Sequence, residues 1–337
     1  MTRGNKWYII DTLMEQFTIG IDVGGTKTAY GLLDGEKRIV RRLSHPSDSR
    51  CPPERFFDRI AAGIDELLAA GHIEKGSLRG VGIGMPSFIL FEEGRIVKTS
   101  NLPLIRDFPA RAYLREKLAG LRVILDNDAH TAAVAELRRG AGRGFENLLY
   151  CPVSTGIATG IIINGKIFRG RYGWAGESGH MIVTPDDGIE CGCGNRGCLM
   201  SWCSGSMIIK HIKKWIEAGE SSSITEFAGA QELNCNHLAM AYNAGDALAR
   251  RAIAQMVTFL GIWTYNLYVT LNINCFVFGG GLLKLFHELT LNGKPGSLLD
   301  AMKEVFDRYN KNTMPVYFKE AELGDDFGII GAAELLF

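Results

Sequence analysis

The chain has 337 residues, of which 46% are hydrophobic and 22% charged, and its formal net charge at pH 7 is zero. The length suggests roughly two domains of about 150 residues each. Neither the charge balance nor any long apolar run indicates a nucleic-acid or membrane partner, and we expect none.

Residues 1–16 form an N-terminal extension in which Asp11 and Glu15 interrupt short apolar pieces. The pattern is not that of a signal peptide, so we expect a cytoplasmic protein. We interpret the extension as a short amphipathic helix on the surface or at a partner interface.

The first regular element is a strand over 17–21 that ends in the turn Asp22-Val-Gly-Gly-Thr-Lys27, and a second strand follows over 28–33. This is not a P-loop, which would need GxxxxGK[ST] between a strand and a helix. The backbone N–H groups of such a glycine turn can nevertheless bind an anion. Asp22, beside the turn, could hold water or Mg²⁺ in the phosphate region.

The same layout returns roughly 130 residues later, as a strand over 148–153, the turn Ser154-Thr155-Gly156, a strand over 157–163 and a hairpin turn at Asn164-Gly165. Two such units predict a duplicated α/β domain, with two glycine turns that grip a polyphosphate. Chance similarity of two hairpins is the alternative.

Other periodic segments complete the α/β pattern. We predict helices over 53–70, 129–140, 247–271 and 328–337, and strands over 78–85, 121–125 and 275–278. The strand over 78–85 leads into a turn at Pro86-Ser87. The last strand ends in Gly279-Gly280-Gly281, which would let a flat group approach the backbone, although a mere tight turn is equally consistent.

Asn127 and Asp128 lie where a predicted strand ends and a helix begins, which is where ligands gather in open α/β sheets. Asp128 could accept the proton of a hydroxyl that attacks a phosphoryl group. Helix capping alone would also explain an aspartate at this position.

Four of the eight cysteines lie between Cys191 and Cys203. The spacing Cys191-x-Cys193-x₄-Cys198 places three thiols on a glycine-rich loop, and with His180 they complete a closed tetrahedral zinc site of the structural kind. Reduced cysteines without a metal, or a disulfide, are the alternatives. Since zinc uses one ring nitrogen, the other nitrogen of His180 can contact a neighbouring pocket.

Together these elements resemble the ROK family of sugar kinases and repressors, over nearly the whole chain from about Phe17 to Phe337. The motifs are DVGGTK (22–27), NLP (101–103), NDA (127–129), AGESGH (175–180), CGCGNRGC (191–198), FGGG (278–281) and GIIGAA (328–333).

The resemblance implies an actin-like, ribonuclease H-like α/β fold, duplicated into two domains around a central cleft. The smaller domain would take residues 17–125 and a C-terminal helix at about 322–337. The larger would take 126–321, with the zinc loop. We also expect a homodimer.

The resemblance further implies ATP-dependent phosphorylation of a hexose or hexosamine, usually at the 6-hydroxyl, with Mg²⁺. Asp128 matches the catalytic base. The sugar-binding positions are Ser87, Asn101, Asn127, Glu177 and His180; the nucleotide positions are Asp22, Gly24, Gly25, Thr26, Lys27, Thr155, Gly156, Gly279, Gly280 and Gly281; the zinc ligands are His180, Cys191, Cys193 and Cys198.

Three features depart from the family pattern. The second phosphate motif reads STGIATG (154–160) instead of GTGIGGG. Met200 stands where the family commonly has a glutamate that contacts a sugar hydroxyl, so a different hydroxyl pattern or weaker binding is expected. NLPL (101–104) lacks the Gly-Trp of glucokinase-like members and, with CSG at 203–205, is similar to allose-kinase-like members. Glucose, N-acetylmannosamine and allose remain open as substrates.

Two other functions share the fold. A sugar-responsive repressor would need an N-terminal DNA-binding domain, for which residues 1–16 are too short. An inactive sugar-binding homologue is disfavoured by Asp128, although Met200 and Ser154 are compatible with it.

Overall fold

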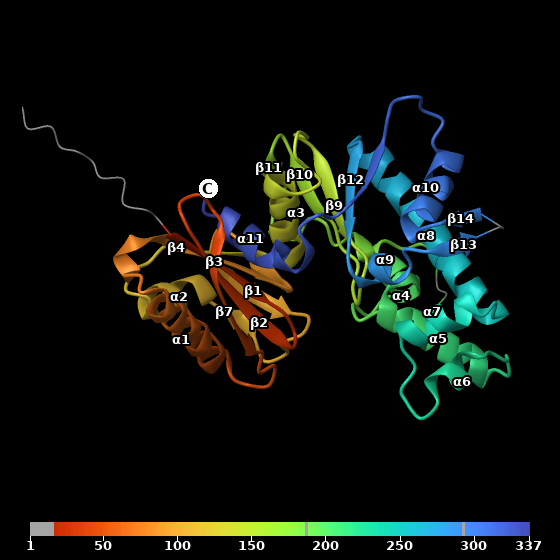
Figure 1. The fold of residues 1–337 in the computed structure, drawn as a ribbon, viewed down its shortest axis with the longest axis horizontal. Coiled ribbons are helices and arrows are strands. Elements are labelled where there is room, and N and C mark those ends of the chain that lie inside the picture. The colour runs from red at the N-terminus through yellow and green to blue at the C-terminus, as the bar shows by residue number, and fades with distance from the viewer. Residues whose placement is uncertain (1–16, 186–187, 292–293) are drawn as a thin grey trace, which may run out of the picture. The chain divides into compact units, whose positions relative to one another are not determined.

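The computed structural model describes residues 17–185, 188–291 and 294–337, shown in Figure 1. The helix predicted within residues 1–16 lies outside these ranges. The described chain divides into two compact units. We call residues 17–126 with 328–337 the N-terminal unit, and Asn127–Phe327 the C-terminal unit.

The N-terminal unit is built on a five-stranded sheet in the order β3-β2-β1-β4-β8. Its strands are β1 (Phe17–Val23), β2 (Lys27–Leu33), β3 (Ile39–Pro46), β4 (Leu78–Met85) and β8 (Val123–Asn127). Strand β1 pairs antiparallel with β2 and parallel with β4. The turn Asp22–Lys27 therefore joins two neighbouring strands, as predicted.

Side chains alternate between the two faces of β1. Ile19 and Ile21 are fully buried in a core shared with helices α1 (Pro53–Gly71) and α2 (Ala110–Lys117). Gly20 faces α11 (Phe327–Glu334), and a Cβ there would lie 1.9 Å from the carbonyl oxygen of Ile329. The returning C-terminal segment thus packs directly on the sheet because the sheet has no side chain at this position.

The N-terminal unit also holds a small antiparallel sheet of β5 (Ser87–Leu90), β6 (Arg95–Thr99) and β7 (Arg106–Phe108). A short 3₁₀ helix, η1, spans Lys75–Ser77.

The C-terminal unit repeats the plan with a sheet in the order β11-β10-β9-β12-β15. Its strands are β9 (Leu148–Pro152), β10 (Gly160–Ile163), β11 (Lys166–Ile167), β12 (Cys275–Gly279) and β15 (Tyr317–Glu320). Strand β9 pairs antiparallel with β10 and parallel with β12, as β1 does with β2 and β4. The matching order confirms the predicted duplicated α/β fold.

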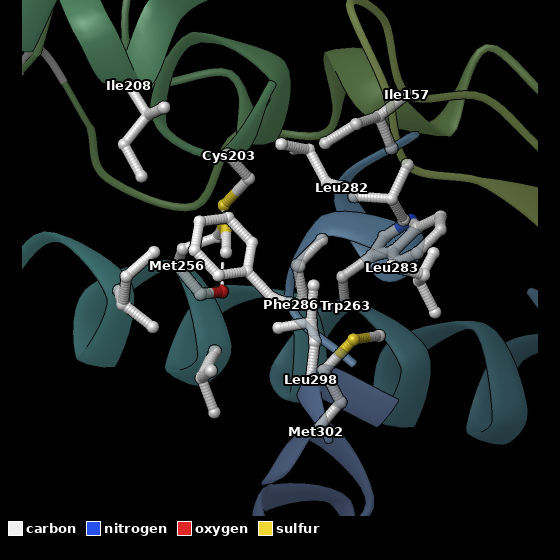
Figure 2. Packing of buried hydrophobic residues seen from close by; sticks show 14 of the residues in the cluster. Ile157, Cys203, Ile208, Met256, Trp263, Leu282, Leu283, Phe286, Leu298 and Met302 are labelled. Carbon is white, nitrogen blue, oxygen red and sulfur yellow. Dashed lines mark hydrogen bonds between the residues drawn. The ribbon is translucent and has the colours of Figure 1, made fainter. Parts of the chain in front are cut away.

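Alternation again separates two faces of the sheet. Leu149 and Phe276 enter a large core formed with helices α8 (Ala247–Leu271) and α10 (Leu298–Tyr309). Leu148 and Val277 point to the opposite face, where helix α3 (Asp128–Arg139) packs. Figure 2 shows the centre of the large core, in which Trp263 and Met302 are fully buried.

The remaining elements of the C-terminal unit lie mostly after the cysteine loop. They are η2 (Ser178–His180), α4 (Leu199–Cys203), α5 (Gly205–Glu217), α6 (Ile224–Ala228), α7 (Cys235–Asn243), α9 (Gly281–Leu285), β13 (Leu289–Leu291), β14 (Lys294–Gly296) and η3 (Gly324–Asp326). None of the helices in the described ranges is long and apolar enough to cross a membrane.

Most observed elements lie within one or two residues of the predicted ones. The strand predicted over 157–163 begins only at Gly160, because Ile157 forms just an isolated bridge with Val153, and the last helix ends at Glu334. The strand expected over 121–125 runs instead over 123–127, because Ala119 and Gly120 adopt positive φ at the end of α2 and delay the return to extended backbone. The strand consequently ends directly at Asn127, next to Asp128.

Candidate functional site

The glycine turn of the N-terminal unit is closed by one backbone bond, from Gly24 N to the carbonyl of Lys27 at 2.9 Å. Thr26 and Lys27 are exposed at its tip. A Cβ on Gly25 would lie 3.1 Å from the Cβ of Asn101, so the predicted sugar ligand Asn101 packs against the predicted phosphate turn. Buried Ser87 donates its hydroxyl to the carbonyl of Met85 at 3.1 Å.

Asp22 lies at the other end of this turn. Its carboxyl group packs against Gly328, where a Cβ would fall 2.3 Å from Cγ of Asp22. The glycine at the start of the returning helix therefore leaves room for the carboxylate.

Asn127, and not Asp128, caps helix α3. The Asn127 side chain accepts a hydrogen bond from Ala129 N at 2.8 Å, and Asp128 is the first helical residue. The capping alternative raised for Asp128 is therefore wrong, because the helix begins one residue earlier than predicted, at Asp128, and Asn127 takes the N-cap position. Asp128 Oδ1 also accepts from Ala129 N at 2.9 Å.

The half-buried Asp128 carboxyl group has a raised pKa, since removal of water disfavours its charge. The hydrogen bond from Ala129 N and the nearby His130 oppose this effect without cancelling it. A carboxylate with a raised pKa is a stronger base than an exposed one, as proton transfer from a hydroxyl requires.

The segment that carries Glu177 is fixed at its base. The His130 Nε2 atom donates to the carbonyl of Ala175 at 3.0 Å, and Thr159 N donates to the carbonyl of Gly176 at 2.7 Å. Gly176 has φ +98°, and a Cβ there would lie 1.8 Å from the oxygen of Thr159. Helix α3 and Thr159, the residue before strand β10, together set the position of Glu177.

His180 connects two groups through its two ring nitrogens. Its Nδ1 lies 3.4 Å from Sγ of Cys191, and its Nε2 lies 3.9 Å from Oε2 of Glu177. One ring nitrogen thus lies beside the cysteine loop and the other beside Glu177, a predicted sugar ligand.

The cysteine loop has the geometry of a zinc site. The ligand atoms of His180, Cys191, Cys193 and Cys198 all lie within 4.8 Å of one another, and Sγ of Cys193 is 3.6 Å from Sγ of Cys198. A tetrahedral zinc with Zn–S of about 2.3 Å and Zn–N of about 2.0 Å separates two sulfurs by about 3.8 Å, and a sulfur from a nitrogen by about 3.5 Å. The two printed separations, Cys191 Sγ to His180 Nδ1 at 3.4 Å and Cys193 Sγ to Cys198 Sγ at 3.6 Å, are close to these values, so the donor set suits this ion.

The side chain of Met200 lies near both Gly156, in the second glycine turn, and Gly179, next to His180. Its Cε would be 4.0 Å from a Cβ on Gly156 and 3.0 Å from one on Gly179. The position where the family places a carboxylate therefore holds an apolar methyl group in contact with both segments.

A pocket of about 510 Å³ opens beside the second glycine turn. Its walls come from the turn, from one side of α5, from the start of α7 and from α9. The lining residues are Ser154, Thr155, Gly205, Ser206, Ile209, Lys210, Lys213, Glu232, Leu233, Asn234, Cys235, Gly281, Leu282 and Leu285. Its size and its apolar walls suit a flat heterocycle with a polar tail.

Some of the predicted nucleotide residues line the pocket, whereas others shape the backbone beside it. Thr155 and Gly281 line the pocket. Gly279 ends β12, and Gly280, with φ +105°, approaches the carbonyl of Val153 so closely that a Cβ would lie 2.4 Å from its oxygen. The α5 wall was not predicted, because Lys210 and Lys213 resemble ordinary surface positions of an amphipathic helix.

Comparisons with known proteins match nearly the full length of the chain. Residues 18–337 match the model of the ROK family. The chain is 33% identical to a glucokinase from Halalkalibacterium halodurans, covering 96% of both chains. It is similar to the structure of a ROK family glucokinase from Streptomyces griseus in complex with glucose and AMPPNP, with a TM-score of 0.75, 28% identity and coverage of 95% and 98%.

A relative with another function is also similar. The chain is 32% identical to a xylose repressor from Caldicellulosiruptor bescii over 236 residues, which cover 70% of this chain and 57% of the repressor. The match along nearly the full length, the duplicated sheets and the motifs together identify this chain as a member of the ROK family.

Proposed function

We propose that this protein transfers the γ-phosphoryl group of ATP to the 6-hydroxyl of a hexose or hexosamine, with Asp128 as general base. Family membership and the glucokinase relative make the chain a sugar kinase. The base, the acceptor hydroxyl and the ligand set are our proposal. The observation that carries it is the arrangement at the start of α3, where Asn127 caps the helix and the carboxylate of Asp128 is left with a raised pKa.

In this proposal the sugar ligands are the motif residues Ser87, Asn101, Asn127, Glu177 and His180. Contact between Glu177 and His180 supports a shared role, because the imidazole restricts the positions open to the carboxylate. Asp128 accepts the hydroxyl proton as the oxygen attacks the γ-phosphorus.

ATP is the donor, and the 510 Å³ pocket receives its adenosine. The two glycine turns, at Asp22–Lys27 and at Thr155-Gly156, offer backbone N–H groups to the phosphates. Asp22 is the residue that would hold Mg²⁺, directly or through water; the ion would neutralise charge on the phosphates. Zinc on the cysteine loop is structural, because protein ligands fill all four positions.

A panel of hexoses and hexosamines with ATP, followed by ADP release in a coupled assay, tests the proposal. It predicts ADP release that requires sugar and differs strongly among epimers. Sugar-independent ADP release, or none with any sugar, would contradict it. Light scattering in the same preparation tests the expected homodimer.

A second candidate, a sugar-responsive regulator, is favoured by the similarity to the xylose repressor. Turnover separates the two functions: a regulator binds the sugar without consuming ATP.

A further inference from the structure

One wall of the nucleotide pocket is continuous with the cysteine loop. Cys198 is the N-cap of α4, which ends at Cys203, and Ser204 alone separates α4 from α5. Helix α5 then supplies five of the lining residues: Gly205, Ser206, Ile209, Lys210 and Lys213. The placement of α5 therefore decides the width of the pocket.

Two buried aromatic side chains hold α5 back against α4. The rings of Trp202 and His211 stack with centroids 4.1 Å apart and an interplanar angle of 12°. Trp202 is 9% exposed and His211 is 4% exposed. His211 lies on the same helix as the lining residues Ile209 and Lys213, so the stack anchors the helix that forms this wall.

Hydrogen bonds extend this contact to the cysteine loop. The Nε2 atom of His211 donates to the carbonyl of Ser201 at 2.9 Å, and Nε1 of Trp202 donates to Oγ1 of Thr184 at 2.7 Å. Val183 N in turn donates to the carbonyl of Gly197 at 2.8 Å, beside the ligand Cys198. The stack thus joins the pocket wall to the segment that holds the metal ligands.

We propose that His211 is a positioning residue for the phosphoryl donor. Its imidazole, fixed between Trp202 and the Ser201 carbonyl, sets the distance between α5 and the opposite wall at Leu282 and Leu285. The inference rests on the proposed function, since it assigns the pocket to ATP. A general structural role would weaken sugar and nucleotide binding alike, whereas this positioning role weakens nucleotide binding more than sugar binding.

The test replaces His211 by leucine, which fills similar space but removes the stacking and the hydrogen bond. Calorimetry with a non-hydrolysable ATP analogue and, separately, with the preferred sugar measures the two dissociation constants. We expect the nucleotide constant to rise about tenfold, or about 1.4 kcal/mol, because a ring contact and a hydrogen bond are both lost. Zinc content per chain should match wild type, and sugar affinity should change by much less than nucleotide affinity.

His237→Leu is the matched control. His237 is also a buried histidine, 6% exposed, on α7 near the same pocket, and no ring contact joins it to Trp202 among the described residues. Its replacement should leave nucleotide affinity unchanged. Should His211→Leu fail to fold, His211→Phe decides the matter: it keeps a ring beside Trp202 and should show a smaller loss in the same direction.

Unchanged nucleotide affinity in a folded, zinc-loaded His211 variant would overturn the inference, as would equal losses for sugar and nucleotide. A wild-type protein that binds no nucleotide would instead refute the proposed function.

Discussion

Replacing Asp128 by asparagine should separate catalysis from folding. Asparagine keeps an oxygen that can accept from Ala129 N, and Asn127 retains the cap of α3. The variant loses only the base. Since general base catalysis contributes typically about 10²–10⁴-fold, we expect kcat to fall at least about 10²-fold, or about 2.7 kcal/mol of barrier.

The expected effect of Asp128→Asn on stability is small, because two contributions oppose each other. The pKa of Asp128 is raised in the folded state, so the folded protein binds the proton more tightly than the unfolded chain does. The stability from this group is present below the unfolded pKa and is lost as the pH rises through the folded pKa. At neutral pH the charged form is therefore unfavourable, and asparagine relieves it. Loss of a negative charge from the first turn costs about 0.3–1 kcal/mol, so Tm should rise or fall by no more than about 4 °C.

Asp246→Asn is the matched control, because Asp246 caps α8 by accepting from Ala249 N at 2.8 Å. Burial raises its pKa, but hydrogen bonds from Ala249, Ser223 and Ser222 lower it further, so its charge stabilises the folded state above the unfolded pKa. This variant should lose stability at pH 7 and keep its turnover. Coupled ADP assays and thermal unfolding of both variants give the comparison. Turnover by Asp128→Asn near the wild-type rate would refute the assignment of the base.

Other substitutions test neighbouring parts of the site. Met200→Glu should shift the preference among sugar epimers, since it places a carboxylate between Gly156 and Gly179; an unchanged ratio of kcat/KM values across the sugar panel would show that this position does not contact the sugar. Cys193→Ser should remove zinc and raise the KM for sugar at least about tenfold, with a smaller effect on ATP; full sugar affinity in a folded protein shown to be zinc-free by metal analysis would separate the loop from the sugar site. Gly176→Ala should destabilise the protein by about 1–3 kcal/mol more than Gly144→Ala, because both have positive φ but only Gly176 meets a neighbouring backbone oxygen; equal shifts in thermal unfolding would contradict this. The pH profile of kcat/KM should fall on acidification at a pH above the ordinary carboxyl pKa of about 3.9, and a profile that is flat to that pH would argue against a base with a raised pKa.

Much of the fold could be predicted because local signals agree with the tertiary structure. The helix over 247–271 and the strand over 78–85 have the predicted bounds, since their apolar patterns are long and their ends carry turn residues. The hairpin at Asn164-Gly165 follows from two residues that accept positive φ. The shifted strand before Asn127 depends on the positive φ of Ala119, for which alanine gives no sequence signal.

The candidate site also has a part that was predictable from the sequence and a part that was not. The metal ligands were predictable because cysteine spacing on a glycine-rich loop is a local property. The α5 wall and the Trp202–His211 stack were not, because they depend on how α4 and α5 pack against each other. A buried histidine at position 211 has no local pattern that distinguishes it from a core residue. The roles proposed for individual site residues stay predictions.

Transfer of a phosphoryl group from ATP to a sugar is tested most directly by ³¹P NMR of the reaction mixture. Wild-type protein is incubated with ATP, Mg²⁺ and the sugar preferred in the coupled assay, and Asp128→Asn is run in parallel. We expect equal amounts of ADP and sugar 6-phosphate from wild type, and at least about 10²-fold slower formation by the variant. Inorganic phosphate in place of a sugar phosphate, or a phosphate on another hydroxyl, would contradict it.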